Sequence, residues 1–334
     1  MTRNRNVKSY EGCHTSLFYN LRWSVPGMFK KMTIKKILRT IHTLFDWKFR
    51  IIYVRSRPWA VRLEAAAICN LKCVTCDTRD KKFEKGQAKI MTLKSFRHIC
   101  KMISHNVYRM TFYVMGEPLM NKNIFKMVEI ASKENMYTSF ASNFTLMKKT
   151  YLKELFDSGL DWLSVALDGF TQETYSKYRV CGNVENLKNG IRMVMEYKKL
   201  NNYKKPFLTV YCIDFFHVRP EISEIKRFCT ELNVDEFRLR HDNSNWDNSY
   251  KHRVLKKPIR NCYWPWICLT IDADGSVYPC YYALKKGFRY GNLLKQDLDE
   301  IWNNNYFMET RKYIKSKIKK SNLNLPCYTC SLFN

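Results

Sequence analysis

Residues 65–76 read AAAICNLKCVTC, which places three cysteines in a CxxxCxxC pattern directly after an apolar segment. The thiolates of Cys69, Cys73 and Cys76 lie close enough in sequence to hold three corners of a [4Fe–4S] cluster, leaving the fourth iron without a protein ligand. A structural zinc site is the alternative, but such sites use four closed ligands, usually as two CxxC pairs. No further Cys or His lies near enough in sequence to complete one here. The pattern therefore favours an iron–sulfur cluster.

The composition is that of a globular chain of about two domains, with 334 residues of which 46% are hydrophobic and 15% aromatic. No run of 18 apolar residues predicts a membrane-spanning helix. The first residues lack the apolar core of a secretory signal. We therefore expect the 13 cysteines to be free thiols or cluster ligands in a reducing cytoplasm.

The formal net charge of +28 raises the question of a polyanionic partner. The basic residues are spread along the whole chain, and neither an RNA-binding aromatic motif nor a Cys–His zinc finger is present in the sequence. Nucleic acid is thus disfavoured as a partner. Peripheral contact with an anionic membrane, at the inner face, stays open.

Residues 1–56 form a basic extension ahead of the cysteine motif. Between residues 28 and 54, apolar side chains recur at helical spacing and basic side chains lie on the other side. Such a helix either docks on its own domain, which is the commoner arrangement, or lies on an anionic membrane surface. The apolar positions are Met32, Ile34, Ile37, Leu38, Ile41, Leu44 and Phe45, and the basic ones are Lys30, Lys31, Lys35, Lys36 and Arg39.

Short apolar strands alternate with helical segments over residues 57–245. Six βα repeats predict an α/β fold, with a parallel sheet and outer helices in a six-stranded, TIM-like partial barrel. Functional groups in such folds gather at the carboxyl ends of the strands, where the cysteine loop would lie. The predicted strands are 61–67, 109–115, 138–142, 162–167, 207–212 and 236–240, and the predicted helices are 93–103, 124–134, 149–158, 184–198 and 221–232.

The CxxxCxxC motif after the first strand resembles the signature of the radical S-adenosylmethionine (SAM) superfamily. In that family the open iron binds the amino and carboxylate groups of SAM. Reductive cleavage then yields a 5′-deoxyadenosyl radical that removes a hydrogen atom from substrate. The resemblance implies a partial barrel, a SAM-binding [4Fe–4S] cluster, SAM itself, and an electron donor such as flavodoxin or ferredoxin.

Two further strand ends resemble family motifs. Gly116, Glu117 and Pro118 follow the second strand and are similar to the GGEP motif, whose backbone and glutamate hold the amino group of SAM. Ser142 and Asn143 end the third strand in a segment similar to a Thr-Asn-Gly pattern near the ribose. A phenylalanine replaces that glycine at position 144, which leaves the local backbone shape undecided.

The fourth strand ends in a segment that resembles the family pattern SLDG…Y…R. Ala166 stands where serine is usual, so that hydroxyl contact is missing. The resemblance suggests that Arg179 pairs with the SAM carboxylate through a two-pronged hydrogen bond. For Asp168, a site role and a simple turn-forming role remain equally open.

A second cysteine group occupies the C-terminal region. Cys262 and Cys280 flank a predicted hairpin over residues 271–277 with an Asp-Gly turn, and Cys327 and Cys330 form a CxxC near the last residue. Four thiolates suit either zinc or a [4Fe–4S] cluster by spacing alone.

The same layout resembles a twitch domain, the shortened form of the SPASM extension of radical SAM enzymes. The resemblance implies that residues 246–334 hold one auxiliary [4Fe–4S] cluster, fully coordinated by these four cysteines and suited to carrying an electron. Residues 291–302 also fit the family segment between hairpin and CxxC. Cys268 is an undecided extra ligand, more readily explained as a buried apolar residue.

The resemblance predicts a radical SAM oxidoreductase that carries out a two-electron oxidation of a sugar, polyol, lipid-linked glycan or peptide. A radical epimerase using the thiol of Cys181 or Cys212, or a peptide-modifying maturase, is the alternative. The alternative from outside the enzymes is a non-catalytic, basic binding protein that metal ions stabilise. The catalytic proton acceptor is unassigned; the residues near the ends of the fifth and sixth strands are Asp214, His217, His241 and Asp242.

Overall fold

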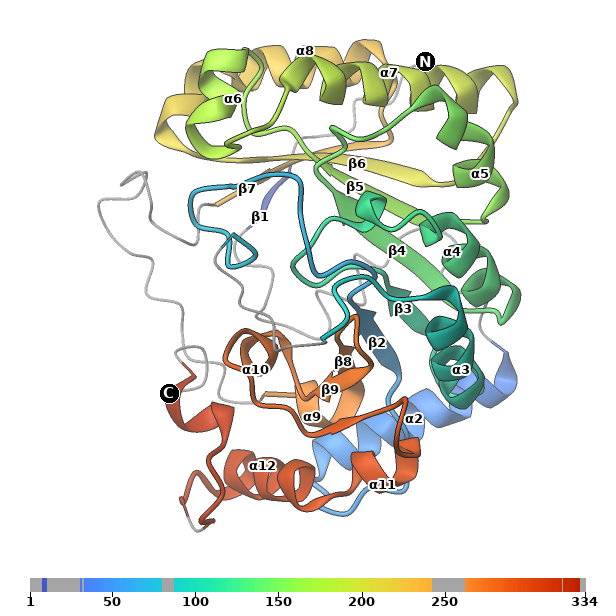
Figure 1. The fold of residues 1–334 in the computed structure, drawn as a ribbon, viewed down its shortest axis with the longest axis vertical. Helices are drawn as coiled ribbons and strands as arrows, with labels where there is room; N and C mark the ends of the chain where they lie inside the picture. The colour runs from blue at the N-terminus through green and yellow to red at the C-terminus, as the bar shows by residue number, and fades with distance from the viewer. Residues whose placement is uncertain are drawn as a thin grey trace.

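The computed structural model describes residues 8–10, 31, 33–79, 87–241, 262–319 and 321–330. Within these residues, ten strands form one sheet in the order β1-β7-β6-β5-β4-β3-β2-β8-β9-β10 (Figure 1). Neighbours from β1 to β8 pair in parallel, whereas β8–β9 and β9–β10 are antiparallel. The strands are β1 (Lys8–Tyr10), β2 (Ala60–Leu63), β3 (Arg109–Thr111), β4 (Tyr137–Ser142), β5 (Trp162–Ala166), β6 (Phe207–Ile213), β7 (Glu236–Arg240), β8 (Cys268–Ile271), β9 (Ser276–Tyr278) and β10 (Gly291–Asn292).

Helices connect successive parallel strands and lie along the outside of the curved sheet (Figure 1). The predicted α/β class, a partial (β/α)6 barrel with a small C-terminal hairpin and helices, is confirmed. The helices are α2 (Ile34–Lys48), α3 (Leu93–Ile103), α4 (Ile124–Lys133), α5 (Leu152–Asp157), α6 (Gln172–Tyr178), α7 (Val184–Leu200), α8 (Ile222–Glu231), α9 (Trp264–Ile267), α10 (Tyr281–Lys285), α11 (Leu298–Trp302) and α12 (Asn305–Ser316).

The six predicted strands of the barrel are all present, but two of them end four residues earlier than predicted. The segment 61–67 leaves the sheet after Leu63, and 109–115 leaves it after Thr111. In both cases the remaining apolar residues are buried in the loops that build the carboxyl end of the barrel. Apolar runs alone do not distinguish a strand from a buried loop, so the predicted strands were too long.

Strand register gives the sheet two different faces. One face carries fully buried apolar side chains, such as Met110 and Leu163, which pack against the outer helices. The other face, which we call the inner face, carries polar and aromatic side chains; Arg62, Thr111 and Ser139 are register partners on it. Because side chains alternate along each strand, this polar face is a property of the whole barrel.

The C-terminal hairpin is part of the main sheet. Strand β8 pairs with β2 in parallel, with Ala60 opposite Cys268 and Leu63 opposite Ile271. Gly275 occupies the predicted turn with a positive φ of 82°, a conformation that glycine adopts at little cost. The hairpin was predicted from its sequence, whereas its attachment to β2 was not.

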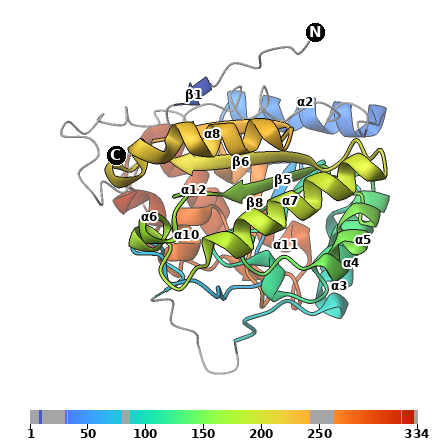
Figure 2. The same ribbon diagram turned by 90° about the horizontal axis from the view of Figure 1, so that it is seen from above.

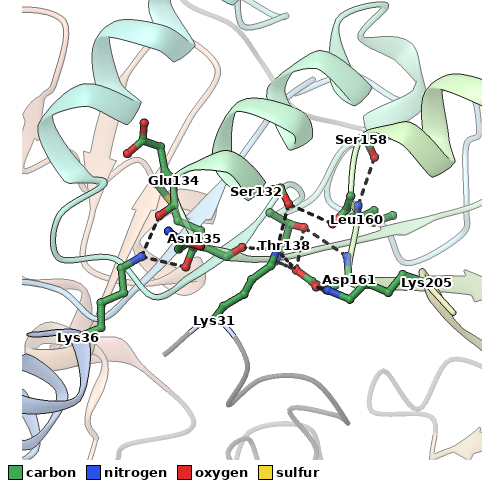
Figure 3. A network of polar contacts seen from close by, with 12 residues as sticks. Lys31, Lys36, Ser132, Glu134, Asn135, Thr138, Ser158, Leu160, Asp161 and Lys205 are labelled. Carbon is green, nitrogen blue, oxygen red and sulfur yellow. Dashed lines mark hydrogen bonds and ion pairs between the residues drawn. The ribbon is translucent and has the colours of Figure 1, made fainter. Parts of the chain in front are cut away.

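Helix α2 lies across the amino-terminal ends of the barrel strands. Its Lys36 ammonium donates to the carbonyls of Glu134 and Asn135 just before β4, at 3.0 and 2.9 Å (Figure 3). Thr43 donates to the carbonyl of Arg57 just before β2. Figure 2 shows α2 at the edge of the molecule away from α6, which follows the carboxyl end of β5. The helix therefore closes the base of the barrel.

Helix α2 docks on its own domain, the arrangement that the sequence favours, and it does so through its polar side. The buried residues of α2 are Lys36, Thr43 and Asp46, while Ile34 and Ile41 are exposed. The polar side of α2 binds backbone carbonyl groups that lie just before the barrel strands β2 and β4. Apolar periodicity alone does not reveal such partners.

Ahead of α2, Lys31 is anchored by the buried carboxylate of Asp161 at 2.7 Å, next to the start of β5 (Figure 3). The same carboxylate also accepts from Lys205 and from the backbone N–H of Thr138. Burial lowers the pKa of Lys31, and the charge of Asp161 opposes that shift. One carboxylate thus joins three segments at the base of the barrel.

We predict that Asp161→Asn lowers the free energy of unfolding by about 3 kcal/mol, because Lys31 is left buried beside a neutral amide. Chemical denaturation with a matched control measures this. Asp157→Asn, which alters only exposed contacts with Lys153 and Tyr203, should cost much less stability. Equal losses in the two variants would contradict the anchoring role.

Candidate active site

The cysteine loop leaves β2 at the carboxyl end of the barrel and is held by backbone hydrogen bonds. The N–H of Lys72 donates to the carbonyl of Val180 at 3.0 Å, and that of Val74 donates to Tyr178 at 3.2 Å. These bonds fix the loop against the segment that follows α6. Cys73 is buried and its two neighbours in the motif are half-buried, all as free thiols.

The three thiols have surroundings that suit cluster ligation. The sulfur of Cys69 accepts hydrogen bonds from the backbone N–H of Leu71 at 3.4 Å and from the side-chain amide of Asn143 at 3.6 Å. The sulfur of Cys73 accepts one from the guanidinium of Arg179 at 3.5 Å. Burial raises the pKa of Cys69 to about 12. A thiolate here needs a bound cation to form, and donors already point at the sulfurs. The residues therefore fit an iron–sulfur cluster.

Over the described residues, no three Cys, His, Asp or Glu side chains are arranged to hold one metal ion. In a cubane each thiolate binds a different iron, so its ligands do not have to meet at a single ion.

Gly116 packs directly against the start of the cysteine loop. An added Cβ would lie 1.9 Å from the carbonyl oxygen of Ala66 and 2.8 Å from that of Ile68. The buried carboxylate of Glu64 accepts the N–H groups of Met115 and Gly116 at 2.6 and 3.1 Å. Glu64 was missed by sequence reasoning, although an acidic residue inside an apolar strand is the signal that identifies it.

Glu117 connects the ends of three strands. Its N–H donates to the carbonyl of Ile68 after β2 at 2.9 Å. Its carboxylate accepts the hydroxyl of Ser142 at 2.7 Å and the N–H of Asn143 at 2.8 Å, both at the end of β4. Burial raises its pKa, and these hydrogen bonds oppose the shift. Pro118 begins a short 3₁₀ turn directly after it.

The end of β4 adopts the backbone shape that its sequence left undecided. Phe144 has a φ of 62°, in the left-handed region where glycine is usual, and its ring is fully buried. The Asn143 side chain donates to Asn70 at 2.9 Å and accepts from Thr145. A bulky residue thus holds the turn that glycine would form, and Asn143 faces the cysteine loop.

Asp168 and Arg179 form a buried ion pair. Arg179 Nε lies 2.7 Å from Asp168 Oδ2, and Asp168 also accepts the N–H of Ile213 at 2.7 Å. Asp168 is thus more than a turn-former, because it holds the guanidinium that contacts Cys73 and joins β5 to β6. The structure brings Arg179 to the cysteine loop.

The four C-terminal cysteines are brought together from three segments. Burial raises the pKa of Cys327, and the nearby thiols of Cys262, Cys280 and Cys330 raise it further. Burial also raises the pKa of Cys262, to about 12. Cys268 is buried in β8, where its thiol donates to the carbonyl of Leu269. The segment before α9, the start of α10 and the CxxC thus lie close to one another.

A direct contact joins the two cysteine groups. Asp77, the residue after Cys76, accepts the hydroxyl of Tyr281 at 2.8 Å and the ammonium of Lys285 at 2.7 Å. Tyr281 is the residue after Cys280. One hydrogen bond therefore connects the loop of the first cysteine group to a ligand position of the second.

Other residues singled out from the sequence are placed less centrally. Asp214 pairs with Arg219, and His217 stacks on Phe215. Cys212 lies on the helix-covered face of β6 and is fully buried, whereas Cys181 is exposed. His241 ends the described segment after β7 and Asp242 lies outside the described residues.

Comparison with known families agrees with this arrangement. Residues 63–213 match the family model of the Radical SAM superfamily. The chain carries a radical SAM domain. Residues 262–331 match the SPASM family, described as an iron–sulfur cluster-binding domain. Together the two domains imply a SAM-binding [4Fe–4S] cluster, SAM and auxiliary iron–sulfur ligation in the SPASM part.

Curated relatives share the barrel region. A probable GTP 3′,8-cyclase of Methanococcus maripaludis strain C5 is 33% identical over 152 residues, 45% of this chain and 50% of that protein. An Fe-coproporphyrin III synthase of Methanosarcina barkeri is 33% identical over 119 residues, 33% of this chain and 27% of that protein. The chain thus spans about half or less of the length of these relatives.

Two solved structures share the fold over most of the chain. Streptococcus suis SuiB bound to SAM has a TM-score of 0.63 at 15% identity, covering 88% of this chain and 74% of that one. The protein anSMEcpe with bound SAM has a TM-score of 0.57 at 17% identity, covering 82% and 86%. At these identities the likeness concerns the fold.

We predict that Gly116→Ala abolishes cluster loading, because the new Cβ forces the loop away from Ala66 and Ile68. Iron content and the visible absorption of the reconstituted protein measure this. Gly287→Ala is the control: its φ is positive at 75°, but no atom lies within 4 Å of the added Cβ. It should cost about 1–2 kcal/mol of stability and leave iron content unchanged. Full iron loading in Gly116→Ala would refute the close-approach argument.

Proposed function

We propose that the chain is a radical SAM oxidoreductase in which the auxiliary cluster receives one electron from the substrate. The observation that carries this proposal is the Asp77–Tyr281 hydrogen bond, which links residues adjacent to Cys76 and Cys280. This bond holds the auxiliary cysteine group next to the loop of the SAM cluster. An electron acceptor so close to the SAM site suits an oxidation, because an oxidation must pass an electron to an acceptor.

In this proposal Cys69, Cys73 and Cys76 ligate the first cluster and leave one iron open. Donors to the sulfurs of Cys69 and Cys73 stabilise their thiolates. The close approach of the Gly116 backbone and the buried ends of β3 and β4 would exclude water from the open iron.

The SAM site in this proposal lies over Gly116–Pro118, Ser142 and Asn143. Both oxygens of the Glu117 carboxylate already accept hydrogen bonds, so its contribution to the SAM ammonium comes from remaining lone pairs and from its charge. Arg179, oriented by Asp168, supplies the positive charge for the carboxylate of SAM.

When bound, the cluster and SAM would supply a 5′-deoxyadenosyl radical that removes a hydrogen atom from a substrate C–H bond. The oxidation is complete when the substrate also loses a proton and one electron. Cys262, Cys280, Cys327 and Cys330 would hold the acceptor of that electron with all four positions filled. Such full coordination favours electron transfer over substrate binding.

The epimerase alternative needs a thiol that can return a hydrogen atom to the substrate. Cys212 lies on the face of β6 that the helices cover, which argues against it. The exposed Cys181 follows Arg179 in the loop after α6 and is the thiol on which this alternative rests. A peptide substrate gains support from a fold neighbour, SuiB, whose structure is also known bound to the precursor peptide SuiA.

The inner face supports a substrate that carries a negative charge. Arg62, Arg109, Arg238 and Arg240 lie on this face, and over strands β2 to β8 its carboxylate is Glu236, which pairs with Arg238 at 2.7 Å. Four guanidiniums are therefore gathered on one face of the sheet. We include in the proposal that the substrate is a phosphorylated or carboxylated member of the sugar, glycan or peptide classes.

We predict that Cys73→Ala retains about four irons per chain, in the auxiliary cluster, and forms no 5′-deoxyadenosine with SAM and dithionite. Cys327→Ala should also retain about four irons but should still form 5′-deoxyadenosine, because its first cluster is intact. Iron analysis and chromatography of anaerobically reconstituted protein measure both.

The control is Cys229→Ala, a buried cysteine of α8 away from both groups. It should retain about eight irons and wild-type cleavage. Wild-type protein that holds zinc in place of iron, or that forms no 5′-deoxyadenosine, would defeat the proposal.

We predict that substrate-dependent 5′-deoxyadenosine formation is stimulated by the fraction of a cell extract that binds an anion exchanger. Arg62→Gln, which removes one inner-face charge, should weaken that stimulation about tenfold and leave uncoupled cleavage unchanged. Arg192→Gln on the outer helix α7 is the control and should respond as wild type. Stimulation confined to the unbound fraction would overturn the anionic substrate while leaving SAM chemistry intact.

A further inference from the structure

We propose that α2 seats the base of the barrel on an anionic membrane surface. The outward side of this helix carries large apolar side chains that nothing in the described structure covers. The exposed fractions are 77% for Ile34, 62% for Leu38, 58% for Ile41, 52% for Phe45 and 57% for Phe49. They recur at intervals of three to four residues and so form one continuous stripe.

The rotation of the helix about its axis is fixed by its polar side. Lys36 binds two carbonyls of the loop before β4. Asp46 is buried and accepts the N–H of Ser56 at 3.2 Å, and Thr43 donates to Arg57. Rolling the apolar stripe inward would break all of these contacts and bury aliphatic groups against backbone carbonyls. These polar contacts therefore keep the apolar stripe on the side of α2 that faces away from the barrel.

The charges beside the stripe suit acidic lipids. Lys35, Arg39 and Lys48 are exposed, and the acidic residue of α2, Asp46, is buried on the opposite side. A groove between α2 and the adjacent loops is lined mainly by basic groups, among them Lys35, Arg39 and Lys133, with Glu134 as its carboxylate. Apolar side chains flanked by basic ones are the pattern of helices that lie in the plane of an anionic membrane.

A membrane fits this face better than a second copy of the chain. Two copies meeting through α2 would bring their lysines and arginines together within molecules that each carry a net charge of +28. An anionic lipid surface neutralises the same charges. The helix has 15 residues, about 22 Å at 1.5 Å per residue, so its whole length can lie flat. None of the described helices is long and apolar enough to cross a membrane.

The test is co-sedimentation of the full chain with vesicles, using phosphatidylcholine alone or with added phosphatidylglycerol. We expect wild type to pellet with the anionic vesicles and to be released by about 0.5 M salt. Leu38→Glu combined with Phe45→Glu should weaken vesicle binding about tenfold or more. Phe216→Glu, an equally exposed aromatic at the other end of the barrel, should bind as wild type.

A second pair of substitutions shows whether the first variant loses vesicle binding only because it misfolds. Lys35→Glu with Lys48→Glu changes exposed charges only and should weaken binding to anionic vesicles, whereas Lys177→Glu on α6 should not. Unfolding temperature and gel-filtration mass accompany each variant. Three results would overturn the proposal: wild type that stays in the supernatant, α2 variants that pellet like wild type, or a wild-type dimer that the Leu38/Phe45 variant converts to monomers.

Discussion

The carboxylate of Glu117 is the constraint on which the site depends. A buried carboxylate is tolerated only when hydrogen bonds replace its lost water, and here those bonds come from Ser142 and Asn143 at the end of β4. The backbone of the same residue holds Ile68 at the entrance to the cysteine loop.

Glu117 therefore sets the separation between the ends of β2, β3 and β4. Asn143, held in this way, reaches Cys69. Asp168 performs the same task on the other side of the loop, where its hold on Arg179 brings a positive charge to Cys73. Two buried acids, each satisfied by fixed donors, thus hold the loop from both flanks.

Much of this arrangement follows from the sequence. The barrel strands and outer helices are long enough and periodic enough for their apolar patterns to identify them. The spacing of the cysteines and the resemblance of Gly116-Glu117-Pro118 to a family motif predicted where the site lies. Strand ends were less accurate, since the buried loop after Leu63 is as apolar as the strand itself.

Other features depend on contacts that no local pattern records. Strand β1 has three residues, and its pairing with β7 joins positions more than 200 residues apart. The Asp77–Tyr281 bond joins the cysteine loop to the start of α10, which is more than 200 residues away in sequence. For α2, periodicity gave the helix correctly but not its orientation, because the decisive partners are backbone carbonyls at the strand starts.

The pairing of β8 with β2 has a consequence for how the protein matures. Strand β2 leads into the first cysteine loop, and β8 lies between Cys262 and Cys280 of the second group. Anything that disorders the hairpin removes an edge partner from the strand that presents Cys69. The two metal centres are thus built on one shared piece of sheet, and a chain that has not completed its C-terminal end lacks part of the scaffold for its N-terminal cluster. The strand that leads to Cys69 therefore has both of its neighbours only when the chain has folded as far as Ile271.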